Sequence, residues 1–498
     1  MERSTLAEGF LHRFVGFAKS HPEQLAIRDL DNQGANYSYR QLLEQAEQRR
    51  AALSALKVKP EDRVAIILPN GMEFIACYMA VLGSGAIPVI LNCKLTGYEM
   101  EGVMAVAAPA LVITSQDLLQ QHGQCFGCHS LLIGEADEPL PAHATPLAAM
   151  ALTPHPLQLP EGNPLASIQF TYRGVGRPLA VPHRYLDLTR SSDGLHEHFH
   201  PQGVGSVHLV TLPLYAIFGL SVMMVFPLSI GATLLMTNTL LNRDLAEVLS
   251  EHQVSFACLV PDIIRYFNMR LARRKGRTLP LHPRLMLYSG GSHLPADEAE
   301  RLGQLLGCKP VLQGYGLTES MPVLVQSSLA EVHRGAMGQP IRGVELRVVD
   351  SHGHEVGDGQ IGELLIRGAM VIERYEGEPQ ISERFLRDGW LHTGDLVWRD
   401  EQGHVFFYCQ RLRISKIKAQ MVDLAEVEAI ALRHPDVLGA KAYILPDDKE
   451  VNVLHLSVHT RGEVARSALS GLFGEYLSSF KQPRFIEIAT IKEEAHAS

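Results

Sequence analysis

Cysteine and tryptophan are scarce in this sequence, which has 7 and 2 of them among 498 residues. Cysteines this few and this scattered do not make a disulfide framework, so we expect free thiols in a reducing compartment. The N-terminal stretch MERSTLAEGFLHRF has no long apolar core, and no secretory signal is expected. Both absences favour a cytoplasmic protein.

An excess of positive charge is also missing, because 45 Lys and Arg face 54 Asp and Glu and leave a net charge of −9. This balance argues against a broad nucleic-acid-binding surface, although it permits a local basic patch. Low-complexity segments are absent as well. With 46% hydrophobic and 20% charged residues, the composition is that of an ordinary globular protein.

Residues 208–236 form a long apolar stretch free of Asp, Glu, Lys and Arg. Its length is that of a membrane span. Pro213 and Pro227 divide it, however, into a strand at 208–212, a helix at about 217–228 and a strand at 231–236. We therefore expect a buried core and no integral membrane span.

The cysteine-rich stretch CFGCH at 125–129 has the spacing of a covalent haem attachment. With His122 it would also offer four zinc ligands. Haem attachment of this type requires export, and structural zinc usually comes with a second pair of ligands. A plain loop is the favoured interpretation.

Alternating strand and helix patterns recur along the chain. RVAIIL at 63–68 is a continuous apolar strand, 72–82 is an amphipathic helix, and AIPVIL at 86–91 is a second strand. The pattern returns later as strand 231–236, helix 243–253, strand 254–260, helix from Pro261, strand 285–291, helix from Pro295 and strand 309–316. We predict an α/β fold with parallel sheets that bind ligands beyond the carboxyl ends of their strands. A chain of this length is also expected to form at least two domains.

Three polar turns fall at such strand ends. In FTYRGVGRPLAVPH at 170–183, Gly174 and Gly176 would let backbone N–H groups approach an anion, and Arg173 and Arg177 would supply charge. The second turn, YSGGSHLP at 288–295, leads into a helix. Each of these two is compatible with an ordinary turn as well as with a ligand site.

The third turn, LQGYGLTES at 312–320, clusters an aromatic ring, a hydroxyl and a carboxylate. Tyr315 offers a face for a base, Thr318 a donor for phosphate and Glu319 a ligand for Mg²⁺. A simple turn of the chain does not need these three side chains together, so the stretch favours a ligand site.

QGYGLTES, followed by GELLIRG at 362–368 and GWLHTGDL at 389–396, resembles in order and spacing the adenylate-forming superfamily of acyl-CoA synthetases, luciferases and peptide-synthetase adenylation domains. YSYRQLLEQAEQ, DRVAIILPNGMEF and GSGAIPVILN resemble the opening of the same family. The resemblance covers nearly the whole chain. It implies a large N-terminal domain at 1–410, with parallel-rich sheets flanked by helices, and a small, mobile α+β domain at 411–498 joined by a hinge.

The chemistry that the resemblance implies is an acyl transfer in two steps that uses ATP and Mg²⁺. A carboxylate attacks the α-phosphate, pyrophosphate leaves, and a thiol takes the acyl group from the adenylate. Such in-line transfer needs positioning and charge neutralisation more than acid-base groups.

The resemblance also assigns residues to this chemistry. Those at the nucleotide are Thr171, Arg173, Gly174, Gly176, Gly290, Gly291, Gln313, Gly314, Tyr315, Thr318, Asp395 and Arg411. Those at the acid are Tyr215, Ala216, Gly290 and Gly314. The catalytic set is Thr318, Glu319, Arg411 and Lys492, with Glu319 as the metal ligand.

The sequence departs from the family pattern at several of these places. Leu179 stands where the phosphate loop T-S-G-T-T-G-x-P-K-G has its lysine, and Arg173 is a candidate replacement cation. In the hinge stretch 410–428, which is one residue short, Arg413 matches the hinge, and Ala419 or Gln420 replaces a glycine. The chain ends before the family's C-terminal lysine, and Lys492 is the nearby candidate.

Two interpretations follow from these departures: an active ligase with slow adenylation, or a nucleotide- or acyl-binding relative with little turnover. The pocket stretch LPLYAIFGLSVMM at 212–224 has no carboxylate to meet an α-ammonium, so an alkyl or aryl acid is favoured over an amino acid.

The thiol would belong to CoA or to an acyl carrier protein. On the helix at 262–277, a basic group forms either a docking patch for an acidic carrier or a solvated face: Arg265, Arg270, Arg273, Arg274, Lys275 and Arg277.

Overall fold

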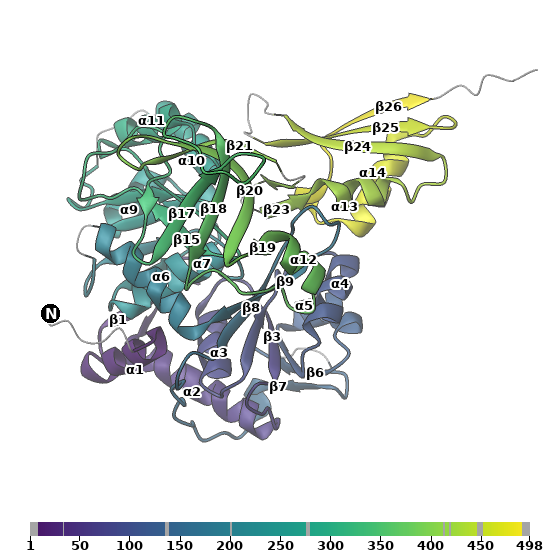
Figure 1. Cartoon of the computed structure of the whole chain (residues 1–498). Coiled ribbons are helices and arrows are strands. Elements are labelled where there is room, and N and C mark those ends of the chain that lie inside the picture. Colours follow the sequence, from purple (N-terminus) through teal and green to yellow (C-terminus); the bar gives the residue numbers. More distant parts are fainter. Residues whose placement is uncertain are drawn as a thin grey trace, which may run out of the picture.

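The structure is a computed structural model that describes residues 8–32, 34–134, 139–199, 202–274, 279–411, 414–417, 420–445 and 452–490. Two large α/β layers and an antiparallel sheet form the main body, and a smaller α+β part at the C-terminal end projects from it (Figure 1). The predicted fold class is confirmed. The boundary at residue 410 stays a prediction.

The first large sheet has nine strands in the order β16-β15-β14-β13-β12-β10-β11-β1-β2. The six strands from β14 to β1 pair in parallel, and the two ends of the sheet are antiparallel. The strands are β1 (Leu25–Asp29), β2 (Ala35–Ser38), β10 (Val207–Val210), β11 (Thr233–Met236), β12 (Phe256–Leu259), β13 (Met286–Ser289), β14 (Leu312–Leu317), β15 (Met321–Val325) and β16 (Gln339–Pro340).

The second large sheet has seven strands in the order β7-β6-β5-β3-β4-β8-β9, parallel except for the last pair. Its strands are β3 (Arg63–Ile67), β4 (Ile87–Ile90), β5 (Leu111–Thr114), β6 (His129–Leu132), β7 (Ala144–Pro146), β8 (Leu165–Thr171) and β9 (Leu179–Arg184). Its central strands are buried on both faces, which explains their unbroken apolar sequences.

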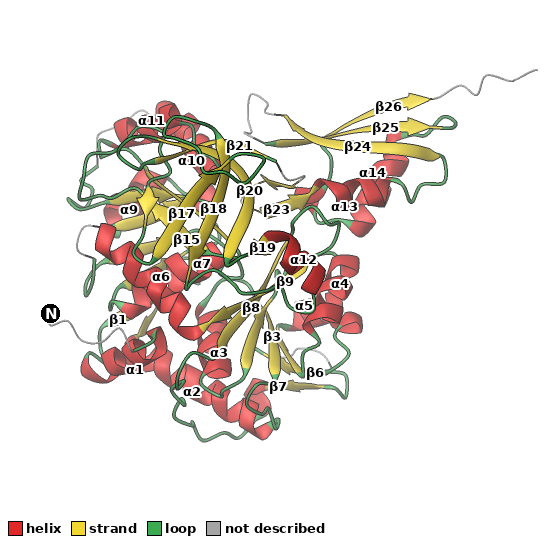
Figure 2. Ribbon diagram, viewed as in Figure 1, coloured by secondary structure: helices red, strands yellow, loops and turns green. Residues whose placement is uncertain are grey.

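Helices cover these sheets, as Figure 2 shows. The helix α3 is buried at all its positions except Glu73, because it lies in the largest core cluster with residues of both sheets. The helices of the main body are α1 (Phe10–Ser20), α2 (Tyr39–Ala55), α3 (Met72–Leu82), α4 (Gly97–Ala107), α5 (Gln116–His122), α6 (Tyr185–His198), α7 (Ile217–Leu220), α8 (Phe226–Ser229), α9 (Leu245–Glu251), α10 (Pro261–Ala272), α11 (Ala296–Leu306) and α12 (Pro379–Phe385).

The uncharged stretch 208–236 folds as β10, a helical segment and β11, as its prolines predict. The helical segment consists of α7, a π-helix at Ser221–Val225 and α8, and the whole π-helix is buried. Across the described ranges, no helix is both long and apolar enough to cross a bilayer.

A five-stranded antiparallel sheet follows and was not expected from the sequence. It consists of β17 (Val344–Val349), β18 (Gly362–Gly368), β19 (Leu386–Arg387), β20 (Trp390–Arg399) and β21 (Val405–Gln410). The motifs GELLIRG and GWLHTGDL are strands of this sheet. Positive φ at Asp388 and Gly389 forms the tight turn between β19 and β20.

The C-terminal part has its own apolar cluster, formed by residues between Ile417 and Ile488. It contains the hairpin β22 (Ile414–Ile417) and β23 (Gln420–Asp423), the sheet β24 (Val437–Leu445), β25 (Val453–Thr460) and β26 (Phe485–Thr490), and the helices α13 (Leu424–Ala431) and α14 (Arg466–Tyr476). Lys492, Arg413 and Ala419 lie outside the described residues.

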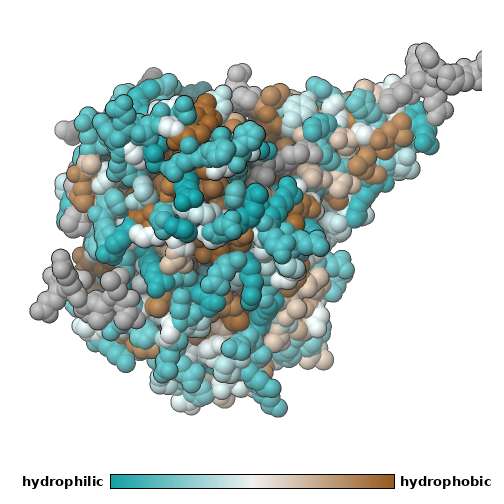
Figure 3. Space-filling model, in the orientation of Figure 1, coloured by the Kyte–Doolittle hydropathy of each residue, from teal (hydrophilic) through white to brown (hydrophobic). Residues whose placement is uncertain are grey.

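Two features singled out in the sequence have local partners. In the stretch 125–129, the Cys125 thiol contacts the Gly97 carbonyl and His129 bonds to the Thr145 hydroxyl. On α10, Arg265 pairs with Glu298, and Arg274 pairs with Asp244. Lys275 and Arg277 are not among the described residues. The face seen in Figure 3 is mostly hydrophilic, with separate small apolar patches.

A buried lysine joins the C-terminal part to the main body. Lys481 is 1% exposed, and its Nζ lies 2.7 Å from Glu99 of α4 and 2.8 Å from Glu426 of α13. It also donates to the Tyr172 hydroxyl at 3.0 Å. The Lys481 ammonium thus forms ion pairs with two carboxylates. Burial raises the pKa of Glu426 to about 6, and the positive charge of Lys481 opposes this rise.

We predict that Lys481→Met lowers the free energy of unfolding by about 3–5 kcal/mol, because it leaves two carboxylates buried without a cation. Glu426→Gln is the matched control and should cost far less. Since the pKa of Glu426 is higher in the folded chain, protonation stabilises the fold, and this contribution is lost as the pH rises through about 6. Urea denaturation at pH 5 and 7 measures both effects; equal losses in the two variants would contradict the prediction.

Candidate nucleotide and acid site

A pocket opens at the carboxyl ends of the parallel strands, where the sequence predicts ligands to bind. Seven of the predicted residues line it: Tyr215, Ala216, Gly290, Gly291, Gly314, Tyr315 and Thr318. Most of its other walls are apolar, from β4, the segment 212–219 and β15. The pocket also includes Lys416, Gln420 and Met421 from the C-terminal part, so both parts of the chain build it.

Two glycines keep the pocket open because larger side chains would collide with its walls. A Cβ at Gly314 would lie 1.6 Å from the Tyr288 hydroxyl, and one at Gly290 would lie 2.8 Å from the Phe218 ring. Gly291 has φ +88°, a conformation that favours glycine. The turn after β13 therefore requires both of its glycines.

Tyr315, which lines the pocket, contacts Asp395 although 80 positions separate them in sequence. The Tyr315 hydroxyl donates to Asp395 Oδ2 at 2.5 Å. Asp395 is 3% exposed, and its Oδ1 has no hydrogen-bond partner among the described residues. Burial raises the pKa of Asp395, while Tyr315, Arg173 and Lys416 oppose the rise. An unpaired buried carboxylate oxygen is costly and indicates a missing donor.

Arg173 points inward instead of extending from its loop. Its guanidinium donates to the carbonyls of His392 and Thr393 of β20 at 2.6 and 3.1 Å. Its Nε lies 3.5 Å from Glu319 Oε1, and both side chains are at most 2% exposed. The Arg173 charge is thus paired inside the protein, and its role as a replacement cation at the nucleotide stays a prediction.

Glu319 is held by the same ion pair. Its Oε1 also accepts a hydrogen bond from the Tyr375 hydroxyl at 2.7 Å. A single carboxylate, completed by substrate phosphates and water, is a usual set of Mg²⁺ ligands. The role of Glu319 as the metal ligand stays a prediction.

The glycine-rich turn after β8 holds an anion, and this anion is a side chain of the C-terminal part. Asp423 Oδ2 accepts a hydrogen bond from the Gly176 N–H at 2.8 Å, while its Oδ1 accepts from Ala425 at the start of α13. Gly174 and Gly176 both have positive φ, at +73° and +75°. The predicted turn thus presents an N–H to a carboxylate.

The remaining predicted residues lie around this centre. Thr171 is buried at the end of β8, and Gln313 bonds through its backbone to Gln326 of the neighbouring segment. The Arg411 side chain is 53% exposed and contacts Glu363 of β18 at 3.3 Å. Their roles at a nucleotide stay predictions.

Lys416 on β22 is a site residue that the sequence reasoning missed. It lines the same pocket as Tyr315 and Thr318. Burial lowers the pKa of Lys416, and the charges of Asp395 and Glu319 oppose this change. Its place in the hinge stretch QRLRISKIKAQ was visible, but no sequence signal placed its side chain in the pocket.

Two residues that line the pocket carry buried polar atoms among apolar walls. The Tyr215 hydroxyl and Gln169 Oε1 are buried without hydrogen-bond partners in the described structure. Apolar walls with a few unpaired polar groups are typical of small-molecule sites.

Comparisons with known proteins find similar ligases that match most of the chain. The chain is 26% identical to 4-coumarate–CoA ligase 3 of Arabidopsis thaliana over 440 residues, covering 84% of this chain and 76% of the relative. It is 26% identical to a long-chain-fatty-acid–CoA ligase of Escherichia coli O157:H7, covering 92% and 87%. Among solved structures, a variant of o-succinylbenzoate CoA synthetase from Bacillus subtilis matches with a TM-score of 0.82 at 21% identity, covering 96% and 94%.

The description "AMP-binding enzyme" belongs to a family model that matches residues 14–376. This range contains the pocket glycines, Tyr315 and Glu319. The resemblance predicted from the motifs is confirmed, and the chain belongs to the family of AMP-binding enzymes.

Proposed function

We propose that this protein is an ATP-dependent, AMP-forming ligase that joins a carboxylic acid to a thiol through an acyl-adenylate. The observation that carries the proposal is the unpaired, buried Oδ1 of Asp395 beside the ring of Tyr315. A ribose hydroxyl would supply the missing donor, and the ring would lie against adenine.

Several residues of this chain would then act in the first step, the formation of the acyl-adenylate. Thr318 and Lys416 lie where the α-phosphate would be held, and Lys416 would stabilise the charge that develops there. Glu319 would hold Mg²⁺, which neutralises phosphate charge when bound. The acid would lie against the apolar walls, with its carboxylate directed toward Thr318.

The alternative is a nucleotide- or acyl-binding relative with little turnover, because Leu179 replaces the loop lysine and Lys492 is the sole candidate at the C-terminal end. Lys416 favours the ligase, since it places a cation in the pocket in spite of these losses. We further propose an alkyl or aryl acid as substrate and CoA or an acyl carrier protein as acceptor. A cytoplasmic location remains a prediction.

Release of pyrophosphate from Mg-ATP tests the proposal. The acids should include fatty acids of several lengths, benzoate and hydroxylated aryl acids, because two unpaired polar atoms lie in the pocket. Mass analysis of the acyl-AMP identifies the acid, and adding CoA or a phosphopantetheinylated carrier protein then identifies the acceptor. Nucleotide binding without pyrophosphate release for any acid would favour the alternative.

Asp395→Asn should weaken AMP binding roughly 10- to 100-fold, because a hydrogen bond to a charged group is worth about 1.5–3 kcal/mol. Isothermal titration calorimetry on the full chain measures this change. Asp350→Asn, in an exposed turn, is the matched control and should bind AMP like the wild type. An Asp395→Asn protein that is folded and binds AMP normally would remove the central assignment.

Lys416→Met should slow acid-dependent pyrophosphate release by roughly 100-fold, as expected for the loss of one donor to the transition state. Because burial lowers the pKa of Lys416, the wild type should lose its cation, and with it activity, as the pH rises through that lowered value. Lys416→Arg retains its charge and should stay active to higher pH. Identical pH profiles for wild type and Lys416→Arg would show that Lys416 is not the cation involved.

Asp423→Asn should tighten ATP binding roughly 10-fold and leave AMP binding unchanged. The carboxylate occupies the Gly176 N–H and repels the β- and γ-phosphates, which AMP lacks. Asparagine is also a good N-cap, so α13 should be retained. Calorimetry with both nucleotides decides the matter, and an equal change for ATP and AMP would contradict this account.

A further inference from the structure

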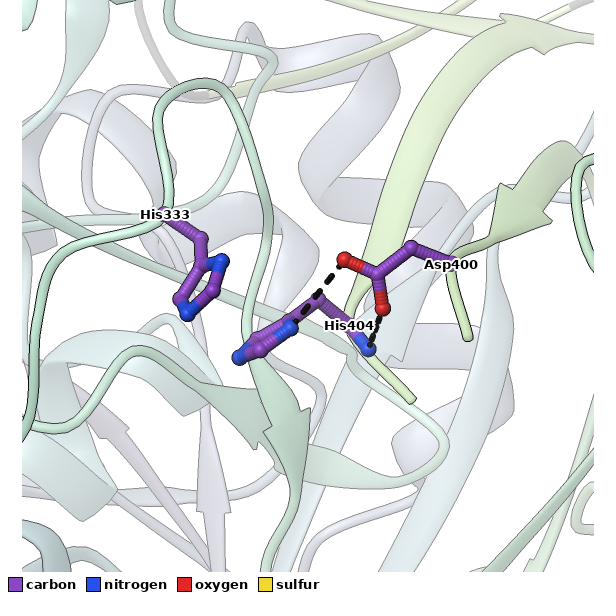
Figure 4. A group of neighbouring side chains, drawn as sticks. All are labelled: His333, Asp400 and His404. Carbon is purple, nitrogen blue, oxygen red and sulfur yellow. Dashed lines mark hydrogen bonds and ion pairs between the residues drawn. The ribbon is translucent and has the colours of Figure 1, made fainter. Parts of the chain in front are cut away.

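A second group of ligand atoms lies outside the nucleotide and acid site. His333 belongs to the segment 326–338 between β15 and β16, and Asp400 and His404 flank the turn between β20 and β21 (Figure 4). One potential ligand atom from each of the three side chains lies within 4.8 Å of the other two. In the described part of the chain, no other three His, Cys, Asp or Glu side chains form such a group.

One pair of these ligand atoms, His404 Nδ1 and Asp400 Oδ2, has the spacing of a tetrahedral metal site, and His333 would turn out of its stack on His404 to complete the set. His404 Nδ1 and Asp400 Oδ2 are 3.2 Å apart. Two ligands bound to one ion at about 2.0–2.1 Å would be roughly 3.3 Å apart at tetrahedral angles. The rings of His333 and His404 face each other with centroids 3.5 Å apart and planes inclined by 24°. Figure 4 shows His404 lying between His333 and the carboxylate.

Hydrogen bonds that involve the backbone hold in place both the segment with His333 and the turn with Asp400 and His404. Gln326 Nε2 donates to the His333 carbonyl at 2.6 Å, and Met337 N–H donates to the Val405 carbonyl at 2.8 Å. Asp400 Oδ1 accepts from the backbone N–H of His404 at 2.8 Å. The His404 and Asp400 side chains are 14% and 25% exposed, so an ion would be partly shielded while solvent could reach it.

The turn at 350–354 has the same backbone arrangement as the turn at 400–404, and comparing the two shows what His333 adds. Asp350 accepts from the backbone N–H of His354 just as Asp400 does from His404, and both turns have a glycine with positive φ before the histidine. Each also has an Asp–His ion pair four positions apart. The Asp–His pair is thus a feature of the turn, and His333 is the addition that completes a ligand set at only one of them.

We propose that His333, Asp400 and His404 bind one divalent transition-metal ion of the zinc type, with water as the fourth ligand. Two imidazoles and a carboxylate suit Zn²⁺ and its neighbours, whereas Mg²⁺ and Ca²⁺ prefer oxygen ligands alone. The ion would link the segment 326–338 to the β20–β21 turn. This site is independent of the magnesium site at Glu319 and of the proposed ligase activity.

The test uses the full chain after treatment with EDTA and removal of the chelator. Titration with Zn²⁺ should give about one tight site, and Co²⁺ should give visible absorption bands of a site with fewer than six ligands. His333→Gln and His404→Gln should each weaken binding at least roughly 10-fold and abolish the rise in melting temperature with Zn²⁺. His354→Gln, in the matched turn, should bind like the wild type.

Unchanged Zn²⁺ affinity in folded His333→Gln protein would overturn the proposal, as would an equal loss in His354→Gln. Circular dichroism and AMP binding check that each variant is folded. Should His404→Gln not fold, Asp400→Asn replaces it, because asparagine retains an acceptor for the turn while it removes the ligand charge.

Discussion

The ion pair between Arg173 and Glu319 is the interaction on which the nucleotide site depends. Two full charges lie at most 2% exposed, and such burial is tolerated only where further hydrogen bonds satisfy both groups. The carbonyls of His392 and Thr393 and the hydroxyl of Tyr375 provide bonds of this kind, although Arg173 Nε, 3.5 Å from Glu319 Oε1, has no hydrogen-bond partner of its own among the described residues. The pair therefore links the turn after β8, the end of β14 and strand β20, so the two large layers and the antiparallel sheet meet at fixed positions. Asp395 belongs to the same strand and takes its position from it.

Much of the fold could be predicted because its signals are local. Strands such as 63–68 are buried on both faces, so their sequences are continuously apolar, and prolines and glycines mark where 208–236 is divided. Tyr315, Thr318 and the glycines 290, 291 and 314 lie in turns at strand ends, and the family resemblance assigned them to one site; all five line the same pocket. The antiparallel sheet escaped prediction, since strands such as GELLIRG were considered for their motif and not for their periodicity.

The partners of the site residues were not predictable, because they lie far away in sequence. Arg173 contacts residues about 220 positions away, and nothing in the turn sequence tells an inward guanidinium from an outward one. The same holds for Asp423, whose contact with Gly176 depends on how the C-terminal part lies against the main body. Charged residues in motifs therefore indicate where a site lies more reliably than they indicate the interaction partner of each side chain.

The absence of a lysine at position 179 and the burial of Arg173 are connected, because both involve Phe385. Leu179, which stands at the lysine position, is fully buried in an apolar cluster with Tyr375 and Phe385. Phe385 also lies under the Arg173 guanidinium, 4.3 Å from its ring centroid. A lysine at position 179 would bury a second cation in the cluster that contains Phe385. The leucine instead packs in this cluster as an apolar side chain. In the proposed ligase, positive charge for a nucleotide would come from Lys416 of the C-terminal part, which lines the pocket.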